Sequence, residues 1–379
     1  MKIILIGNYS KDNQESMNRF AKMLCSGYLE FGISAEIWLP DVLFAKWARS
    51  TNTGAGKWLS YIDKYVVFPI KLKWRLLSRK YNSKDVRFHI CDHSNSIYIT
   101  HLPIDRTLIT CHDVLAIRGA FGFKDAYCPA SVTGKILQKW ILNNLSKAKA
   151  LAAVSHFTLD QLLDLLKGER IFTDKWKVIH NGFNGNFWKM SADQSGPLLI
   201  NAGISIDEPY ILHVGSKLPR KNRKLLLDMV VALGDQYKGK ICFAGQAIDE
   251  EMLDYAISLK LQNRLVQVLK PDHDTLVALY SNCQAFIFPS FSEGFGWPVI
   301  EAQACGAPVI TSELEPFIEV GGKGALYADP NNPGDFATAF LKLNDQCIKR
   351  ELVQEGHNNC SRFNFREMIK SYIALNSIE

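Results

Sequence analysis

The chain has 379 residues, of which 47% are apolar and 22% are charged. This length predicts two folded domains of roughly 100–200 residues each rather than a single core. No apolar run reaches the ~18 residues that a membrane-spanning helix needs, and Met1–Gly7 has the pattern of a strand, not of a signal peptide. Nine cysteines without a Cys-x-x-Cys pair are typical of buried thiols in a reducing compartment. We therefore expect a cytoplasmic protein with neither a disulfide framework nor a zinc site.

The net charge of +6 is distributed unevenly along the chain. Residues 1–190 contain 27 Lys and Arg against 15 Asp and Glu, whereas residues 191–379 contain 17 against 23, so only the first half is basic. The densest basic run, Lys71–Arg87, interleaves its cations with Trp74 and Leu77. Such a run is typical of an amphipathic contact with an anionic membrane surface or a lipid diphosphate, and equally of a solvated helix face whose apolar residues pack inward. Nucleic acid is not an expected partner.

Apolar strands alternate with helical stretches in both halves of the chain. This alternation predicts two doubly wound α/β domains, each with a parallel sheet that is covered on both faces. In the first half, the expected strands are Lys2–Gly7, Ser34–Leu39, Val86–Cys91, Arg106–Cys111, Ala150–Val154 and Lys177–His180, and the expected helices are Gln14–Gly32, Ala130–Leu145 and Thr158–Leu166. In the second half, the expected strands are Tyr210–Val214, Lys240–Ala244, Leu265–Leu269, Ala285–Pro289 and Pro308–Thr311. Periodicity breaks between Asn186 and Pro209, which is where we expect the domain boundary.

Candidate site residues follow three expected strands of the first half. His112 comes directly after an expected strand, at the carboxyl edge of the sheet, where ligands of open α/β sheets bind. His93 follows the expected strand Val86–Cys91 in the same way and is a candidate for lining a pocket that binds a second substrate, the acceptor. Gly7 and Asn8 follow the first strand and would face a donor diphosphate, although the Gly-x-Gly-x-x-Gly pattern of dinucleotide sites is absent.

A cationic loop follows the first strand of the second half. It runs from Gly215 to Lys221 and contains Ser216, Lys217 and Arg220. Breaking a sugar–phosphate bond places negative charge on the departing diphosphate, and fixed cations together with helix-start amides can stabilise that charge. The cations of this loop are candidates for this role. The alternative is a basic turn exposed to solvent.

The segment Pro289–Ala302 places two carboxylates, Glu293 and Glu301, eight positions apart. A buried strand precedes Glu293, which is expected in a tight loop. A helix is expected to begin at Pro298 and to end at Gly306, with Glu301 in its first turn and reaching outward. This spacing suits a nucleotide-sugar, with one carboxylate for the hydroxyls of each sugar.

The backbone between the two carboxylates has its own expected role. Glycines on both sides of Phe295, at Gly294 and Gly296, let main-chain amides approach a ligand and hold phosphate oxygens without a metal. The alternative is an ordinary loop followed by a helix whose dipole favours a glutamate near its start.

Together these motifs resemble the E-x7-E signature of retaining GT-B glycosyltransferases, in particular glycosyltransferase family 4, the group 1 transferases. The segments that carry the resemblance are Cys111–Asp113, Val178–Gly182, His213–Ser216, Arg220–Asn222 and Leu269–Pro330. The resemblance implies the GT-B fold, in which two Rossmann-like domains face each other across a cleft. We expect an acceptor-side domain over residues 1–190, a domain over residues 191–362 that binds the nucleotide-sugar donor, and a C-terminal helix within residues 363–379 that packs back on the first domain.

The resemblance also implies roles for single residues. The expected roles are sugar hydroxyl binding by Glu293, ribose binding by Glu301 and positioning of the transferred sugar by His112. Diphosphate binding in place of a metal is expected from Lys221, with Arg220 or Lys217 as its partner. Main-chain groups near Leu269 are expected to recognise the base. The acceptor hydroxyl would attack on the face from which the diphosphate leaves, so that catalysis depends on positioning and electrostatics. The chain departs from the family pattern at Ser216, where many relatives have an arginine.

The implied activity is the retaining, metal-independent transfer of a hexose of the mannose or glucose type. The donor would be a nucleotide-diphosphate sugar, and the acceptor a hydroxyl of a polysaccharide or lipid-linked glycan precursor. No cofactor is expected besides this donor substrate, and the protein is expected at the inner face of the membrane. The alternatives are a sugar-nucleotide epimerase or phosphorylase with the same fold, and a non-catalytic scaffold or membrane-surface binding protein.

Overall fold

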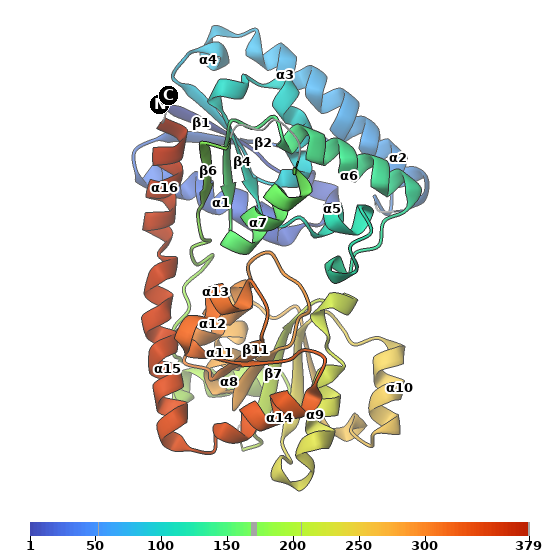
Figure 1. The fold of residues 1–379 in the computed structure, drawn as a ribbon, viewed down its shortest axis with the longest axis vertical. Helices are drawn as coiled ribbons and strands as arrows, with labels where there is room; N and C mark the ends of the chain where they lie inside the picture. Colours follow the sequence, from blue (N-terminus) through green and yellow to red (C-terminus); the bar gives the residue numbers. More distant parts are fainter. Residues whose placement is uncertain (52, 168–172, 206, 378–379) are drawn as a thin grey trace. The chain divides into compact units, whose positions relative to one another are not determined.

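The computed structural model describes residues 1–51, 53–167, 173–205 and 207–377. The chain forms two compact units. In Figure 1 the first is coloured from blue to green, with the C-terminal helix in red, and the second from yellow-green to red. Residues 1–123, residues 128–184 and the chain from residue 365 onward form the first unit, and residues 124–127 and 185–364 form the second. The chain thus enters the second unit at Gly185 and returns to the first at Phe365.

The first unit is built on a six-stranded parallel sheet in the order β2-β1-β3-β4-β5-β6. Its strands are β1 (Lys2–Ile6), β2 (Ser34–Trp38), β3 (Val86–Ile90), β4 (Thr107–Cys111), β5 (Ala150–Ala153) and β6 (Lys175–Val178). All four residues from Ile3 to Ile6 are fully buried, because a parallel sheet is covered on both faces. The strand order reverses between β1 and β3, so the residues that follow these two strands lie at the same point of the sheet edge.

Helices surround this sheet. The α-helices are α1 (Glu15–Glu30), α2 (Gly54–Ile62), α3 (Phe68–Leu76), α4 (Arg79–Asn82), α5 (Leu115–Ala120), α6 (Val132–Leu145), α7 (His156–Leu165) and α16 (Phe365–Ser377). A π-helical turn, η2 (Asp63–Val67), joins α2 to α3, and the 3-10 turns are η1 (Ser10–Asp12), η3 (His93–His101), η4 (Ile104–Arg106) and η5 (Lys124–Ala126). Ser131 and Ser155 cap α6 and α7 by accepting backbone N–H groups of the first turn, which stabilises both helix starts.

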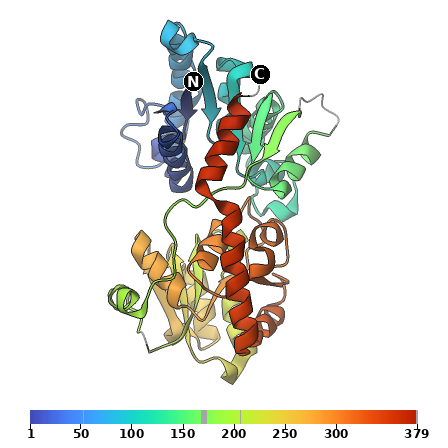
Figure 2. The same ribbon diagram turned by 90° about the vertical axis from the view of Figure 1, so that its left-hand side faces the viewer.

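The last helix, α16, belongs to the first unit and lies across it in Figure 2. Ile369 is fully buried against α1, where a Cβ at Gly27 would lie 2.5 Å from its side chain. Tyr372 is also buried, and its hydroxyl accepts a hydrogen bond from Thr110 of β4 at 3.2 Å. Further along, the backbone carbonyl of Asn376 accepts from Arg87 Nε at 3.0 Å. Apolar packing and buried hydrogen bonds therefore both hold α16 on the first unit.

The second unit also contains a six-stranded parallel sheet, in the order β12-β11-β10-β7-β8-β9. Its strands are β7 (Tyr210–Gly215), β8 (Lys240–Gly245), β9 (Leu265–Leu269), β10 (Ala285–Phe288), β11 (Val309–Ser312) and β12 (Ala325–Ala328). All residues of β10 and β11 are buried. The order reverses between β7 and β10, which are hydrogen-bonded neighbours at the centre of the sheet.

The helices of the second unit cover both faces of its sheet. They are α8 (Ala192–Asn201), α9 (Leu225–Leu233), α10 (Glu250–Ser258), α11 (His273–Asn282), α12 (Trp297–Ala304), α13 (Phe317–Gly321), α14 (Pro333–Lys342) and α15 (Gln346–Cys360). The 3-10 turns are η6 (Pro219–Lys221), η7 (Gly234–Gln236), η8 (Gln262–Arg264), η9 (Gly322–Gly324) and η10 (Ser361–Phe363). Within the described ranges, no helix has both the length and the apolar character needed to cross a bilayer.

Each strand expected from the sequence overlaps a strand of the structure. Three begin at a different residue. The strand β6 begins at Lys175, two residues before the expected start at Lys177. The strands β4 and β11 begin at Thr107 and Val309, each one residue after its expected start. The edge strand β12 was not expected, because its Leu326 and Tyr327 are only partly buried within a four-residue strand. The continuous helical segment from α2 to α3 was also missed. Large apolar residues on its solvent side obscure the one-sided pattern that indicates a surface helix.

The basic run Lys71–Arg87 divides its side chains between the interior and the solvent. The indole of Trp38 contacts the ring of Tyr81 at 4.9 Å and the guanidinium of Arg75 at 4.4 Å, measured between centres. Trp74, in contrast, is 72% exposed. Part of the run therefore packs inward, as expected for a solvated helix face with apolar residues on its inner side. Trp74, however, is exposed to solvent.

Replacing Ile369 by alanine is expected to lower the free energy of unfolding of the first unit by about 2–5 kcal/mol, because it opens a cavity between α16 and α1. Urea unfolding followed by hydrogen exchange at first-unit amides measures this loss, since the two units need not unfold together. Ile373→Ala is the control, because Ile373 is partly exposed on the same helix. Equal losses from both substitutions would contradict the packing described for α16.

Candidate active site

The candidate site of the second unit lies where the strand order of its sheet reverses. The strands β7 and β10 are adjacent and parallel, so the loops that follow them leave the same edge side by side. Ligands of open α/β sheets bind at this point, outside the carboxyl ends of the strands. Both segments singled out in the sequence, the cationic loop and the loop that contains Glu293, are the loops concerned.

The cationic loop folds into a short 3-10 turn before α9 begins. The N–H of Lys221 donates to the carbonyl of Leu218 at 2.8 Å, and the N–H of Asn222 donates to Pro219 at 3.0 Å. Asn222 then adopts a left-handed conformation, with φ of 50°, and its side-chain amide donates to the carbonyl of Pro330 at 2.8 Å. This tight turn fixes the backbone of Lys221 beside the end of β10.

The structure joins both cations of this turn to Glu293. The carboxylate of Glu293 is buried, and its Oε1 accepts a hydrogen bond from the ammonium of Lys221. Its Oε2 lies 2.6 Å from Nη1 of Arg220, which also donates to the carbonyl of Ser292 at 2.9 Å. The ammonium of Lys221 also lies 4.8 Å from the centre of the Phe288 ring, in the range of a cation–π contact. Three of the four expected catalytic residues therefore form one cluster.

Burial and charge act in opposite directions on this cluster. Burial alone would raise the pKa of Glu293, but the charges and hydrogen bonds of Lys221 and Arg220 hold that pKa below its usual value. Burial lowers the pKa of Lys221, and the adjacent carboxylate opposes this shift. The carboxylate of Glu293 is therefore ionised at neutral pH, and its charge is balanced by cations that would otherwise be available to another anion.

Glu301 lies deeper than the sequence suggested. The helix α12 begins at Trp297, so Glu301 is in its second turn and not in its first, and it is buried rather than directed outward. The hydroxyl of Tyr280, from α11, donates a hydrogen bond to Oε2 of Glu301 at 3.0 Å. The expectation was wrong because the helix starts earlier than Pro298, which shifts every later residue along it.

The loop between the two carboxylates has the expected backbone features. Gly296 has φ of 99°, a conformation that side chains rarely adopt, and it precedes the first turn of α12. Gly294 lies directly after Glu293 in the same loop. The ring of Phe295 is buried against Phe363, with the ring centres 5.7 Å apart. Packing of Phe295 thus holds the backbone amides at the start of α12 in place.

Other expected contacts of the donor are spread along the same sheet edge. Gly215 is the last residue of β7, and Ser216 follows it. The N–H of Lys217 donates to Oε1 of Gln246 at 3.0 Å, while the side chain of Lys217 is exposed. Leu269, at the end of β9, is two strands away from β7 and is 59% exposed. These residues share an edge with the Glu293 cluster without being part of it.

The first unit has its own polar cluster where its strand order reverses. Asn8, after β1, donates a hydrogen bond to Asp92, after β3, at 2.5 Å, and it accepts one from Asn95 at 3.0 Å. Burial alone would raise the pKa of Asp92, but nearby histidines and hydrogen bonds lower it overall. At Gly7, a Cβ would lie 2.6 Å from the side chain of Leu39, so the chain needs a glycine there. His93 adds its Nδ1 atom at 3.2 Å from Asp92.

His112 is held at the same edge, directly after β4. Its ring packs edge-on against Phe20, with the ring centres 4.5 Å apart, and its Nε2 lies 2.9 Å from the carbonyl of Cys91. Because a carbonyl can only accept, Nε2 carries the hydrogen. Burial lowers the pKa of His112. The neutral ring therefore offers Nδ1 as a hydrogen-bond acceptor.

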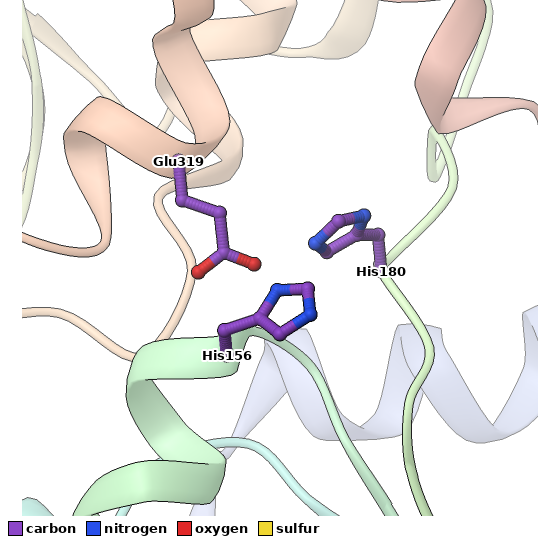
Figure 3. A group of neighbouring side chains, drawn as sticks. All are labelled: His156, His180 and Glu319. Atoms are coloured by element: carbon purple, nitrogen blue, oxygen red, sulfur yellow. The ribbon is translucent and has the colours of Figure 1, made fainter.

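Two other histidines of the first unit lie close together (Figure 3). His156 starts α7 and His180 follows β6, and their ring centres are 5.9 Å apart in an edge-on arrangement. Glu319, labelled in the same figure, belongs to α13 of the second unit. We assign no metal site to these three side chains. The prediction that Lys221 and Arg220 bind the donor diphosphate without a metal stays a prediction.

The structure also shows polar residues that the sequence analysis did not assign to the site. In the first unit this residue is Asp92, which accepts a hydrogen bond from Asn8. In the second unit they are Tyr280, which donates to Glu301, and His213. His213 donates from Nδ1 to the carbonyl of Ile287 at 3.1 Å, which links β7 to β10, and burial lowers its pKa to about 3. No sequence spacing indicates these pairs, because each joins segments that are brought together only by the sheet or by the packing of α11 on α12.

Comparison with known proteins is consistent with this geometry. Residues 201–357 match the family model described as "Glycosyl transferases group 1". The chain is 24% identical over 270 residues to the O-antigen chain mannosyltransferase RfbU of Salmonella typhimurium, covering 70% of this chain and 69% of the relative. It is 27% identical over 281 residues to the O-antigen chain mannosyltransferase B of Escherichia coli, covering 72% and 70%.

Solved structures of similar architecture cover nearly the whole chain. A sucrose-phosphate synthase from Thermosynechococcus elongatus superposes with a TM-score of 0.73 at 19% identity, covering 99% of this chain and 98% of the other. HepE of Anabaena, solved with UDP and glucose, has a TM-score of 0.73 at 16% identity and covers both chains completely. The expectation of two Rossmann-like domains of the GT-B type is confirmed. Residues 201–357 of this chain therefore match the group 1 glycosyltransferases, and the chain has the GT-B fold.

Proposed function

We propose that this glycosyltransferase moves a hexose from a nucleotide-diphosphate sugar to a glycan hydroxyl, with retention at the anomeric carbon and without a metal ion. The observation that carries the proposal is the buried cluster of Lys221, Arg220 and Glu293 at the strand-order reversal. Mannose is the favoured sugar, because two of the relatives are named O-antigen chain mannosyltransferases. A polysaccharide or lipid-linked glycan acceptor fits the same names, and a location at the inner face of the membrane stays a prediction.

The cations of the cluster suit the departing diphosphate. Lys221 and Arg220 are fixed by a tight turn beside the amides that start α12. Such preorganised donors stabilise charge that develops in the transition state, which is the role that a divalent metal has in other transferases. In this assignment, the N–H groups of the Gly294–Gly296 loop steady the phosphate or the sugar. The proposal includes membership of glycosyltransferase family 4.

The two carboxylates suit the two sugars of the donor. Glu293 is next to the cations and would hold hydroxyls of the transferred hexose. Glu301, oriented by Tyr280, would accept the ribose hydroxyls. The acceptor oxygen bonds to the anomeric carbon as the bond to the diphosphate oxygen breaks on the same face, and a phosphate oxygen takes the acceptor's proton. The proposal keeps the roles predicted for three first-unit residues. Gly7 and Asn8 would face the donor diphosphate, and His112 would position the transferred sugar.

The test is a donor screen in the presence of EDTA. Thermal shift and release of nucleoside diphosphate are measured with UDP-, GDP- and ADP-sugars, and NMR of the product reports the anomeric configuration. Lys221→Ala is expected to lower the transfer rate by about 10²–10³-fold, because it removes a preorganised cation. Lys224→Ala is the control, since Lys224 is exposed three residues away.

Other outcomes of the screen separate the alternatives. Donor turnover without an acceptor would identify an epimerase, and dependence on orthophosphate would identify a phosphorylase. Activity that disappears with EDTA and returns with a divalent cation would rule out the metal-free mechanism. No response to any donor would favour a non-catalytic scaffold.

Glu293→Gln is expected to have opposite effects on transfer and on product binding. Transfer should be lost with the sugar contact, whereas the nucleoside diphosphate should bind roughly tenfold more tightly, because the carboxylate no longer competes with phosphate for Lys221 and Arg220. Calorimetric titration with UDP, GDP and ADP measures the affinity, and the exposed Glu313→Gln in the same unit controls for the change in net charge. Unchanged or weaker diphosphate binding in Glu293→Gln would refute this competition.

Tyr280→Phe is expected to weaken donor binding about tenfold, because a hydrogen bond to a charged carboxylate contributes about 1.5 kcal/mol and here it orients Glu301. The affinity for nucleoside diphosphate is the quantity to measure. Tyr210→Phe is a matched control: it also removes a buried hydroxyl, one that donates to the carbonyl of Leu279 at 2.8 Å in the same unit. If both variants bind the donor equally well, Tyr280 has only a structural role.

A further inference from the structure

A cavity of about 300 Å³ lies at the amino-terminal edge of the first-unit sheet. The starts of β3, β4, β5 and β6 line it, and the end of α16 lines another side with Leu375 and Asn376. His112 follows β4, so it lies at the opposite edge of the same sheet. A strand of five residues spans about 16 Å, which separates the cavity from that edge. None of the residues assigned above to the donor or the acceptor lines this cavity.

The register of the sheet brings basic residues together around this cavity. The pairing of β3 with β4 places Arg87 and Arg106 beside each other, one position before the first paired residues. Lys149 directly precedes β5, and Lys175 is the first residue of β6. These four strands are consecutive in the sheet, and adjacent strands lie about 4.8 Å apart. The amino-terminal edge therefore carries a row of cations, and all four of them line the cavity.

Neutral oxygen atoms hold the two arginines of this row. Nε of Arg87 donates to the carbonyl of Asn376 at 3.0 Å, and Nη1 of Arg87 donates to the carbonyl of Lys84. Nη1 of Arg106 donates to the carbonyl of Ser83. Among the residues that the structure describes, no carboxylate lies within ion-pair distance of either guanidinium. Within the same residues, Nη2 of Arg87 and Nε of Arg106 have no hydrogen-bond partner. Both guanidiniums therefore keep N–H donors for a ligand.

Two carboxylates line the same cavity but do not balance its charge. Asp105 forms an ion pair with Lys149, and Asp174 is exposed to solvent. The described lining thus contains four cations against two carboxylates. Burial and the positive charge of Arg87 lower the pKa of Arg106, because each disfavours a second charged guanidinium at this place. An anion bound beside both guanidiniums would offset this repulsion.

We propose that this cavity binds a small organic phosphate ester through its phosphate group. Guanidinium groups match phosphate oxygens in both geometry and charge, and the lysine ammonium groups add further donors. The volume of about 300 Å³ lies at the lower end of the range of small-molecule pockets, about 300–1,000 Å³, and exceeds what a phosphate ion alone needs. Leu108 and Leu375 supply an apolar part of the lining for the organic group of the ester.

Binding of the ester would act on the C-terminal helix. Arg87 joins the start of β3 to the backbone of Asn376, and the side chain of Asn376 donates to the hydroxyl of Tyr28, in α1, at 3.2 Å. A phosphate held by Arg87 and Arg106 would therefore stabilise the last turn of α16 against the sheet. This effect goes beyond the proposed function, and its test needs neither the sugar donor nor the acceptor.

The experiment is hydrogen exchange of the full chain, read by mass spectrometry during titration with inorganic phosphate or with glycerol phosphate at constant ionic strength. Exchange is expected to slow at the start of β4 and in the last turn of α16. Glycerol phosphate should act at a lower concentration than inorganic phosphate, because its organic group also contacts the cavity. Peptides of the second unit report any binding at the Glu293 cluster separately, so the two sites are distinguished.

Two variants and a control locate the phosphate. Arg106→Gln should weaken phosphate binding at least about tenfold, because it removes one positive charge while glutamine keeps an amide donor. Lys175→Gln is the second variant and carries the test if thermal unfolding shows that Arg106→Gln is not folded. Arg79→Gln is the matched control, since Arg79 is exposed on α4 and does not line the cavity. The control should bind phosphate as the wild type does.

Four results would overturn the proposal. The first is slower exchange in α16 with chloride to the same extent as with phosphate. The second is unchanged phosphate binding in the folded test variants. The third is a loss in Arg79→Gln as large as that in Arg106→Gln, which would assign the effect to the general charge of the first unit. The fourth is weaker binding of glycerol phosphate than of inorganic phosphate, which would exclude an ester as the ligand.

Discussion

The candidate site depends on the cost of burying one negative charge. An ionised carboxylate without a partner is strongly unfavourable in a protein interior, so the buried Glu293 requires the cations that accompany it. Because Lys221 and Arg220 belong to the loop after β7 and Glu293 to the loop after β10, the ion pairs lock together two segments 72 residues apart in sequence. The same ion pairs set the electrostatics of the site, and under the proposed function a donor diphosphate would compete with Glu293 for the same cations. The charges of Glu293, Lys221 and Arg220 would therefore contribute both to the stability of the second unit and to binding of the donor.

The fold makes this arrangement possible through the order of its strands. In both units the sheet order reverses once near its centre, and polar residues follow the strands on each side of the reversal. In the second unit this brings the cations to Glu293, and in the first unit it brings Asn8 to Asp92, with His112 after the next strand. The two clusters differ in character, because the first is built from a hydrogen-bonded network around one carboxylate, whereas the second contains two cations.

The sequence predicted the parts of this structure that depend on local pattern. Buried strands such as β1 and β10 are continuous apolar runs, and their neighbours in a doubly wound sheet follow from general rules of topology. For that reason Lys221, Arg220 and Glu293 could be placed at one sheet edge. The contact of Tyr280 with Glu301 could not be predicted, because it depends on how α11 packs on α12. The helical segment from α2 to α3 was missed because its exposed Trp58, Ile70 and Trp74 give it the composition of a buried element.

The path of the chain through the two units has a consequence for biosynthesis. Residues 185–364 form most of the second unit as one continuous stretch, whereas the first unit lacks α16 until residues 365–377 have been made. During translation, the second unit can therefore reach its native state while the first unit still exposes the surface that Ile369 and Tyr372 later cover. The N-terminal half is synthesised first but completed last, so nascent chains present an uncovered apolar face of the first unit to chaperones for the whole time that the second unit takes to emerge from the ribosome.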